Sequence, residues 1–301
     1  MIANTPLFYE VIGYSAALGS AMAWAIGSIL FRKVGEVSSP TGMNLVKCLI
    51  GSVYLGGVLL VAGGVEPISG HTYLVLVVSG LLGIALGDTF FFKALVNLGP
   101  RLTVLLGTLG PVLTIVFAMA FLGEQLSGFD LVGAFLTLAG VNIVLWEDIP
   151  SDLNVKTKWT SGVVYALLAA ICMSLGIITA KVAVDSTSAM HATFARVVFA
   201  GIGLSTWGLA SRQLGSWLLP FKDPILLKAI MVAVFVVIFG GFWLSLVALK
   251  YIDAAIATIL NSTEPIFVLP LVGLILKERV TARAIAGAVV AVAGVALILG
   301  T

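Results

Sequence analysis

Apolar runs of about 20 residues recur along the whole chain, separated by short polar stretches. A run of that length, coiled at about 1.5 Å per residue, crosses a hydrocarbon layer about 30 Å thick. Frequent glycine inside these long runs favours helices over the short alternating segments of a membrane barrel. We therefore expect an all-α integral membrane protein, multi-pass in the plasma (inner) membrane. Its ten transmembrane helices are expected at residues 11–31, 41–62, 73–96, 101–122, 128–146, 161–182, 189–210, 225–249, 253–276 and 282–299.

The polar residues are too few and too scattered for most enzyme classes. Hydrophobic residues make up 60% of the chain and charged residues 10%, and the formal net charge of +2 gives no sign of nucleic-acid binding. His71 and His191, like Cys48 and Cys172, fall in separate segments, which argues against a disulfide, a metal site or a catalytic set. We expect no enzymatic activity, no catalytic residues, no metal and no cofactor.

The chain contains an internal repeat, which decides its architecture. A shift of 149 residues lays residues 13–39 on 162–188, and a later shift of 154 residues lays 110–145 on 264–299. Each copy holds five apolar runs, so the second copy must enter the membrane from the side opposite to the first. Two inverted five-helix repeats are an architecture of secondary transporters, in which the solute site lies near the midplane between the copies.

The repeat also sets the domain boundaries. The first five-helix repeat is expected at residues 1–147 and the second at 161–301, with a polar linker at 148–160.

Specific motifs in both copies resemble a known family. The fourth run ends in "LGEQLS" in one copy and "LKERVT" in the other, and a glycine-rich fifth run follows, "GAFLTLAGVNIVL" or "GAVVAVAGVALIL". These residues are similar to EamA-type members of the drug/metabolite transporter superfamily, over about 13–146 and 162–299. The resemblance implies a ten-helix exporter or permease of small metabolites, with a cavity lined by helices 1, 3, 4, 6, 8 and 9.

We accordingly expect a secondary transporter of small polar organic metabolites such as amino acids, working by alternating access. Its partners would be that solute, membrane lipid and, as a coupling ion, the proton, with no nucleic acid. A non-transporting membrane protein, either an intramembrane enzyme or a sensor, stays the alternative. Basic residues concentrate in the odd-numbered loops, which predicts both termini outside the cytoplasm, whereas the resemblance implies both inside.

Lys47 and Arg196 occupy matched repeat positions, each about 10 Å into its predicted helix. Charges inside a span are candidates for function. Inversion would place these two near opposite membrane faces, as an anion-attracting guide at each mouth. The structural alternative is that their stems snorkel and brace neighbouring carbonyls.

Asp88 and Glu264 lie near mid-span, and their repeat partners are Phe242 and Gly110, which carry no charge. A carboxylate without a repeat counterpart suggests use in transport, as a proton carrier or a partner for a solute ammonium. The structural alternative for Asp88 is an ion pair with Lys47 or Lys93.

Pro111 and Pro265 occupy matched positions inside the fourth runs. Each removes an amide donor and displaces the carbonyl four residues earlier, that of Gly107 and of Asn261. Freed carbonyls beside a cavity can bind a solute, and Asn261 with Thr263 adds side-chain polarity just before Pro265. A packed kink without a ligand is the alternative.

Glycines recur at seven-residue spacing in both fifth runs, at Gly133 and Gly140 and at Gly287 and Gly294. Such a stripe of small residues allows close backbone approach between membrane helices. By analogy with the family we expect these two helices to pack on each other, away from the cavity.

Overall fold

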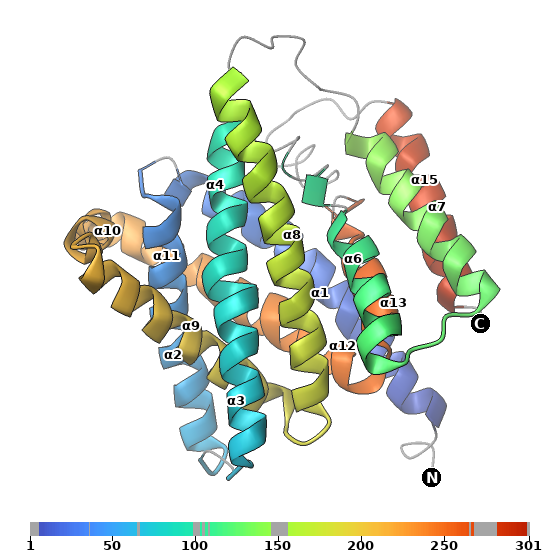
Figure 1. Cartoon of the computed structure of the whole chain (residues 1–301), viewed down its shortest axis with the longest axis horizontal. Helices are drawn as coiled ribbons and strands as arrows, with labels where there is room; N and C mark the ends of the chain where they lie inside the picture. The colour runs from blue at the N-terminus through green and yellow to red at the C-terminus, as the bar shows by residue number, and fades with distance from the viewer. Residues whose placement is uncertain are drawn as a thin grey trace.

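The structure, a computed structural model, describes residues 6–35, 37–64, 67–98, 103, 106–107, 109–145, 156–264, 266–267 and 282–299. Within these ranges every regular element is a helix (Figure 1). The elements of the first half are α1 (Pro6–Gly35), α2 (Pro40–Val61), α3 (Gly70–Ser79), η2 (Gly80–Asp88), α4 (Thr89–Leu98), α6 (Leu109–Phe117), η3 (Ala118–Leu122) and α7 (Gly128–Leu145). Those of the second half are α8 (Lys156–Val184), α9 (Ala189–Ala210), α10 (Leu214–Leu218), η5 (Leu219–Lys222), α11 (Pro224–Phe235), η6 (Val236–Trp243), α12 (Leu244–Tyr251), α13 (Ala254–Asn261) and α15 (Ala282–Leu299).

Five helical segments in the described ranges are long and apolar enough to cross a membrane. They are Pro40–Val61, Gly70–Leu98, Trp159–Val184, Ala189–Ala210 and Pro224–Tyr251. Three shorter apolar helices lie at Leu109–Leu122, Gly128–Gly140 and Ile285–Ile298. The all-helical membrane class is thus confirmed, and the number of ten crossings stays a prediction.

Equivalent helices of the two halves run antiparallel where they touch, as inverted repeats require. At the contact of α2 with α9, a Cβ built on Gly201 would lie 3.4 Å from the Cβ of Cys48, and one on Gly51 would lie 3.3 Å from Cγ1 of Val197. Residue numbers therefore rise along α2 as they fall along α9.

The two halves also exchange partners. The first helix of each half packs on the third helix of the other, so α1 lies against helix 224–251 and α8 lies against helix 70–98 (Figure 1). Glycine makes the second contact close, because a Cβ on Gly176 would lie 2.5 Å from the Cα of Gly83. The halves are therefore interlocked, and neither buries its own helices without the other.

The packing predicted for the two glycine-rich helices is confirmed. α7 and α15 lie side by side at one edge of the molecule, with α10 and α11 at the opposite edge (Figure 1). A Cβ on Gly140 would lie 2.5 Å from the carbonyl oxygen of Gly287, and one on Gly294 would lie 2.6 Å from that of Gly133. Only a hydrogen in place of a side chain permits this approach.

The middle of helix 70–98 and the middle of helix 224–251 are both π-helical, over η2 and η6. The repeat shift of 154 residues places these two segments at almost the same positions. A π-helical turn displaces backbone carbonyls from their usual amide partners and often accompanies a functional site. The two π-helical segments therefore mark equivalent places in the two halves where backbone groups are free to bind side chains.

Candidate functional site

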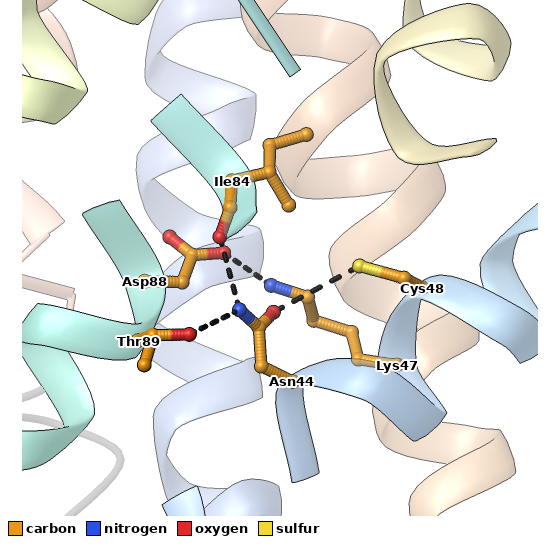
Figure 2. A network of polar contacts seen from close by, with 6 residues as sticks. All are labelled: Asn44, Lys47, Cys48, Ile84, Asp88 and Thr89. Carbon is orange, nitrogen blue, oxygen red and sulfur yellow. Dashed lines mark hydrogen bonds and ion pairs between the residues drawn. The ribbon is translucent and has the colours of Figure 1, made fainter. Parts of the chain in front are cut away.

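A buried ion pair lies where α2 meets η2. The Nζ of Lys47 donates to Oδ2 of Asp88, and the side chains are only 2% and 9% exposed (Figure 2). The structure therefore selects Lys47 from the two partners that the sequence offered. Lys93 instead lies over the rings of Tyr165 and Trp207. An unpaired charge in such a place would cost several kcal/mol, so each member of the pair depends on the other.

Asn44 links this ion pair to the π-helical backbone. Its Nδ2 donates to the carbonyl of Ile84 at 2.9 Å and to Oγ1 of Thr89 at 3.2 Å, and its Oδ1 accepts from the thiol of Cys48 (Figure 2). Since Ile84 belongs to η2, Asn44 ties α2 to the backbone of the π-helical segment. Sequence reasoning missed Asn44, although it lies about one turn before Lys47 on the same helix face.

An aromatic ring covers the other side of Lys47. Its Nζ lies 5.0 Å from the ring centroid of Phe242 on η6, and Trp24 packs edge-on against that ring with centroids 5.0 Å apart. A desolvated ammonium over an aromatic face is stabilised by about 2 kcal/mol. Phe242 is the repeat counterpart of Asp88, so Lys47 lies between two equivalent positions, one on each half.

Arg196 of α9 approaches the same carboxylate. It is 6% exposed and lies within electrostatic range of Asp88, and a Cβ built on Gly83 of η2 would lie 3.2 Å from its Nη2. The prediction that Lys47 and Arg196 lie near opposite faces is therefore wrong, and neither side chain snorkels to the surface. The antiparallel crossing of α2 and α9 brings each residue within about one turn of the crossing point. We call Lys47, Asp88 and Arg196 the charged cluster.

A second polar centre lies where α13 ends. This helix stops at Asn261, inside the run predicted to be helical through residue 276, and Ser262 and Thr263 form a turn. The Oγ1 of Thr263 donates to the carbonyl of Leu260 at 2.7 Å. The interruption falls four residues before Pro265, where loss of the proline amide predicts it. Pro265 itself lies outside the described residues.

Glu264 stands at this interruption and is half-buried, without a hydrogen bond or ion pair to any described residue. The Oδ1 of Asn261 is buried and has no partner within the described ranges. We call residues 261–264 the helix break. No hydrogen bond or ion pair between described residues joins it to the charged cluster, so the predicted site residues fall into two separate centres.

The matched segment of the first half is only partly described. Pro111 is buried in α6 and Gly107 is helical, but Thr108 between them lies outside the described residues. The displacement predicted for the Gly107 carbonyl therefore stays a prediction. The carbonyl of Gly110, the repeat counterpart of Glu264, accepts a 2.9 Å hydrogen bond from Oγ of Ser174 on α8. This bond ties the fourth helix to the second half.

Glu124 forms a contact between the halves that sequence reasoning missed. Its Oε1 accepts from the backbone N–H of Ala254 at 2.8 Å, and its Oε2 accepts from that of Ala255 at 3.1 Å. These amides open α13, where they have no partner within the helix and the dipole favours a carboxylate. Burial raises the pKa of Glu124, and the two amide bonds oppose that effect only in part. The signal was its place in "LGEQLS", but its partner lies 130 residues away in sequence.

Lys181 of α8 binds the turn between α12 and α13. Its Nζ donates to the carbonyls of Leu249 at 2.7 Å and Ile252 at 3.0 Å, where α12 ends. A cation is favoured at the carboxyl end of a helix. The connection between α12 and α13 is therefore held by charged side chains from both halves.

Across the described ranges, no group of three or more metal-binding side chains is brought together.

Comparisons with known proteins agree with this architecture. A crystal structure of another protein matches with a TM-score of 0.74, covering 96% of this chain and 96% of that one. At 17% identity this likeness shows the fold alone. An uncharacterized transporter of Archaeoglobus fulgidus is 27% identical over 284 residues, which cover 94% of this chain and 96% of the relative.

Two bacterial relatives match part of the chain. The uncharacterized inner membrane transporter YhbE of Escherichia coli is 26% identical over 55% of this chain and 53% of its own length. The uncharacterized transporter YvbV of Bacillus subtilis is 34% identical over 45% of each chain. The family described as the EamA-like transporter family matches residues 11–146 and 160–300, which are the two repeats. The chain belongs to the EamA-like transporter family.

Proposed function

We propose that this protein is a secondary transporter of small polar organic metabolites, amino acids among them, working by alternating access. The observation that carries the proposal is the charged cluster, buried where α2 and α9 cross antiparallel between the two halves. In transporters built from inverted repeats the solute binds near that place. Buried charges are expensive in a membrane protein and are kept where a solute or ion passes.

Repeat symmetry suggests how the cluster changes during transport. If the halves exchange conformations, Arg196 takes the place of Lys47, and Phe242 takes the place of Asp88. The ion pair of Lys47 with Asp88 then opens. Arg196 comes to face Asp88 in the way that Lys47 now faces the ring of Phe242. Asp88 would pass from one cation to the other between the two states. The bistable element is thus a carboxylate with two alternative partners.

Glu264 is the proposed proton carrier, with Asp88 the second candidate. It has no described partner to fix its charge and stands at the helix break, where a change in packing would alter its access to water. Since burial penalises the charged carboxylate, its proton affinity would differ between the two facing states. The proton would then move with the solute.

The experiment compares wild type with Glu264→Gln in proteoliposomes that contain only this protein. We expect uptake of labelled metabolites driven by a pH gradient to be lost in Glu264→Gln, while counterflow, the exchange of solute down its own gradient, survives. Glu10→Gln, at an exposed position on α1, is the matched control and should behave as wild type. Unchanged pH dependence in Glu264→Gln would remove this residue from coupling.

The same preparation tests transport itself. Folded wild-type protein that moves no solute across a broad metabolite panel, by gradient or by counterflow, would contradict transport and favour an intramembrane enzyme or a sensor. No observation on the described residues favours either of these alternatives.

A further inference from the structure

We infer that Arg196 binds the carboxylate of the transported solute, and that this solute is a small organic anion with one net negative charge. The inference rests on the proposed function, because it names the solute class of the same site. It narrows the proposal from polar metabolites in general to monocarboxylates. Binding of a zwitterion or of a multivalent anion in place of a monocarboxylate would overturn it.

The net charge of the cluster favours an anion. Lys47, Asp88 and Arg196 are 2%, 7% and 6% exposed, and together they carry two positive charges and one negative. Apart from the pair of Lys47 with Asp88, no ion pair is found between described residues. One positive charge is therefore left without compensation by any described residue. A monoanion would neutralise it, whereas a zwitterion would leave it unchanged and a cation would add to it.

The buried guanidinium of Arg196 favours a carboxylate ligand. Its Nε is buried without a partner, and its guanidinium makes no hydrogen bond with any residue in the described part of the chain. A guanidinium has five N–H donors in a planar fork, and an unmet buried donor is expensive. Proteins therefore satisfy such donors, or keep them for a ligand. The fork fits the two oxygens of a carboxylate better than any neutral acceptor.

The turn of η2 that faces the Arg196 guanidinium places no acceptor side chain against this fork. The carboxylate of Asp88 is occupied by Lys47, which also lies over the ring of Phe242. The Nη2 of Arg196 faces Gly83, where a glycine presents no side chain. The surface of η2 beside the guanidinium therefore offers backbone and apolar contact only. An incoming carboxylate meets donors from Arg196 and no competing acceptor side chain from that turn.

The test uses acetate, a small monocarboxylate, so that it does not depend on knowing the solute. Thermal unfolding of purified wild type is measured in acetate and in chloride at equal ionic strength, with acetamide as the neutral analogue. We expect acetate, but not acetamide, to raise the Tm in a concentration-dependent way. Alanine supplies the zwitterion and inorganic phosphate the multivalent anion.

Three variants assign the effect. Arg196→Gln should weaken acetate binding about 10- to 100-fold, which is the loss expected for a charged hydrogen-bonded pair. Arg196→Lys keeps the charge without the fork and should give an intermediate loss. Arg283→Gln, at an exposed position on α15, is the matched control and should bind acetate as wild type does. Without ligand, Arg196→Gln should unfold at a higher temperature than wild type, because it removes an uncompensated buried charge.

The results separate this inference from the proposed function. Acetate stabilisation that is absent in wild type or unchanged in Arg196→Gln would overturn the inference, as would a lower Tm of unliganded Arg196→Gln. Flux and counterflow in proteoliposomes test transport independently. Transport of a solute without a carboxylate would leave the proposed function standing and refute the anion site. Acetate binding without any flux would leave the anion site standing and contradict transport.

Discussion

Asp88→Asn is the change to which the charged cluster should respond most strongly. In the native protein this carboxylate compensates Lys47 directly and Arg196 at longer range. Replacing it by the neutral amide keeps size and shape but leaves two buried cations without a counter-charge. Lys47→Met is the informative contrast, because Asp88 then still has Arg196 within electrostatic range.

The magnitude follows from burial. Both side chains of the ion pair are nine-tenths or more buried, and breaking such a pair from one side costs about 3–5 kcal/mol. Asparagine still accepts a hydrogen bond from the Nζ of Lys47, so we expect the lower end, a loss of about 3 kcal/mol in the free energy of unfolding for Asp88→Asn. Lys47→Met should lose less. The double variant Asp88→Asn with Lys47→Met should lose less free energy of unfolding than the sum of the two single losses, because both members of the ion pair are removed together.

The free energy of unfolding is measured by titrating denaturing detergent into mixed micelles, with helicity and tryptophan fluorescence as two probes. Coincident transitions by the two probes show whether a single free energy is defined. Wild-type stability in Asp88→Asn would refute the buried pair. A larger loss in Lys47→Met than in Asp88→Asn would refute the assignment of Arg196 as the second cation acting on this carboxylate.

Three further predictions follow from other parts of the fold. Gly140→Ala should lower the free energy of unfolding by about 1–3 kcal/mol without changing solute preference, because its Cβ would meet backbone atoms of α15 at 2.5 and 2.8 Å. The control Gly57→Ala, whose Cβ would have nothing within 4 Å, should not lower stability, and a change in solute preference in Gly140→Ala would place Gly140 in the pocket. Burial raises the pKa of Glu124 in the folded protein, so the wild type should lose stability relative to Glu124→Gln as pH rises from about 4.3 through that raised pKa. Thermal unfolding across pH measures this difference, and a gain in wild-type stability over that range would mean that the amide bonds from α13 outweigh burial. Alkaline phosphatase fused after Thr301 should be active if the loop charges set the orientation, and a fluorescent cytoplasmic reporter there would instead support the orientation that the family resemblance implies.

Much of the fold was predictable because it depends on local sequence. The repeat predicted two inverted copies, and the glycine stripes together with the family resemblance predicted the packing of α7 on α15. Pro265 predicted a disturbed carbonyl at Asn261, where α13 in fact ends, because the loss of an amide acts on a carbonyl at a fixed distance along the chain. Each of these features is determined within one helix or by one pairing of helices.

The composition of the charged cluster depends on packing between helices, and sequence reasoning got part of it wrong. Depth along a helix placed Lys47 and Arg196 on separate faces, because depth alone says nothing about where α2 and α9 cross. The partner of Asp88 could be narrowed to two lysines but not chosen. Asn44 had no assigned role because its partners, the Ile84 carbonyl and the Thr89 hydroxyl, lie on another helix and meet it only through packing. The same limit hid the pairing of Glu124 with α13.

The fold repeats, but its charges do not, and this difference has a consequence for the site. Both halves place a cation at the α2 and α9 crossing, whereas only the first half places a carboxylate on the π-helical segment, because the second half has Phe242 where the first has Asp88. A second carboxylate at that position would make the cluster neutral and remove the net positive charge that favours an anion. The aromatic ring instead faces Lys47, which already has its partner, and the guanidinium of Arg196 keeps its donors unmet by any described residue. The two repeats thus pack symmetrically but leave one net positive charge at the contact of the halves. Such a charge would attract a single anion to the place where alternating access would carry it across.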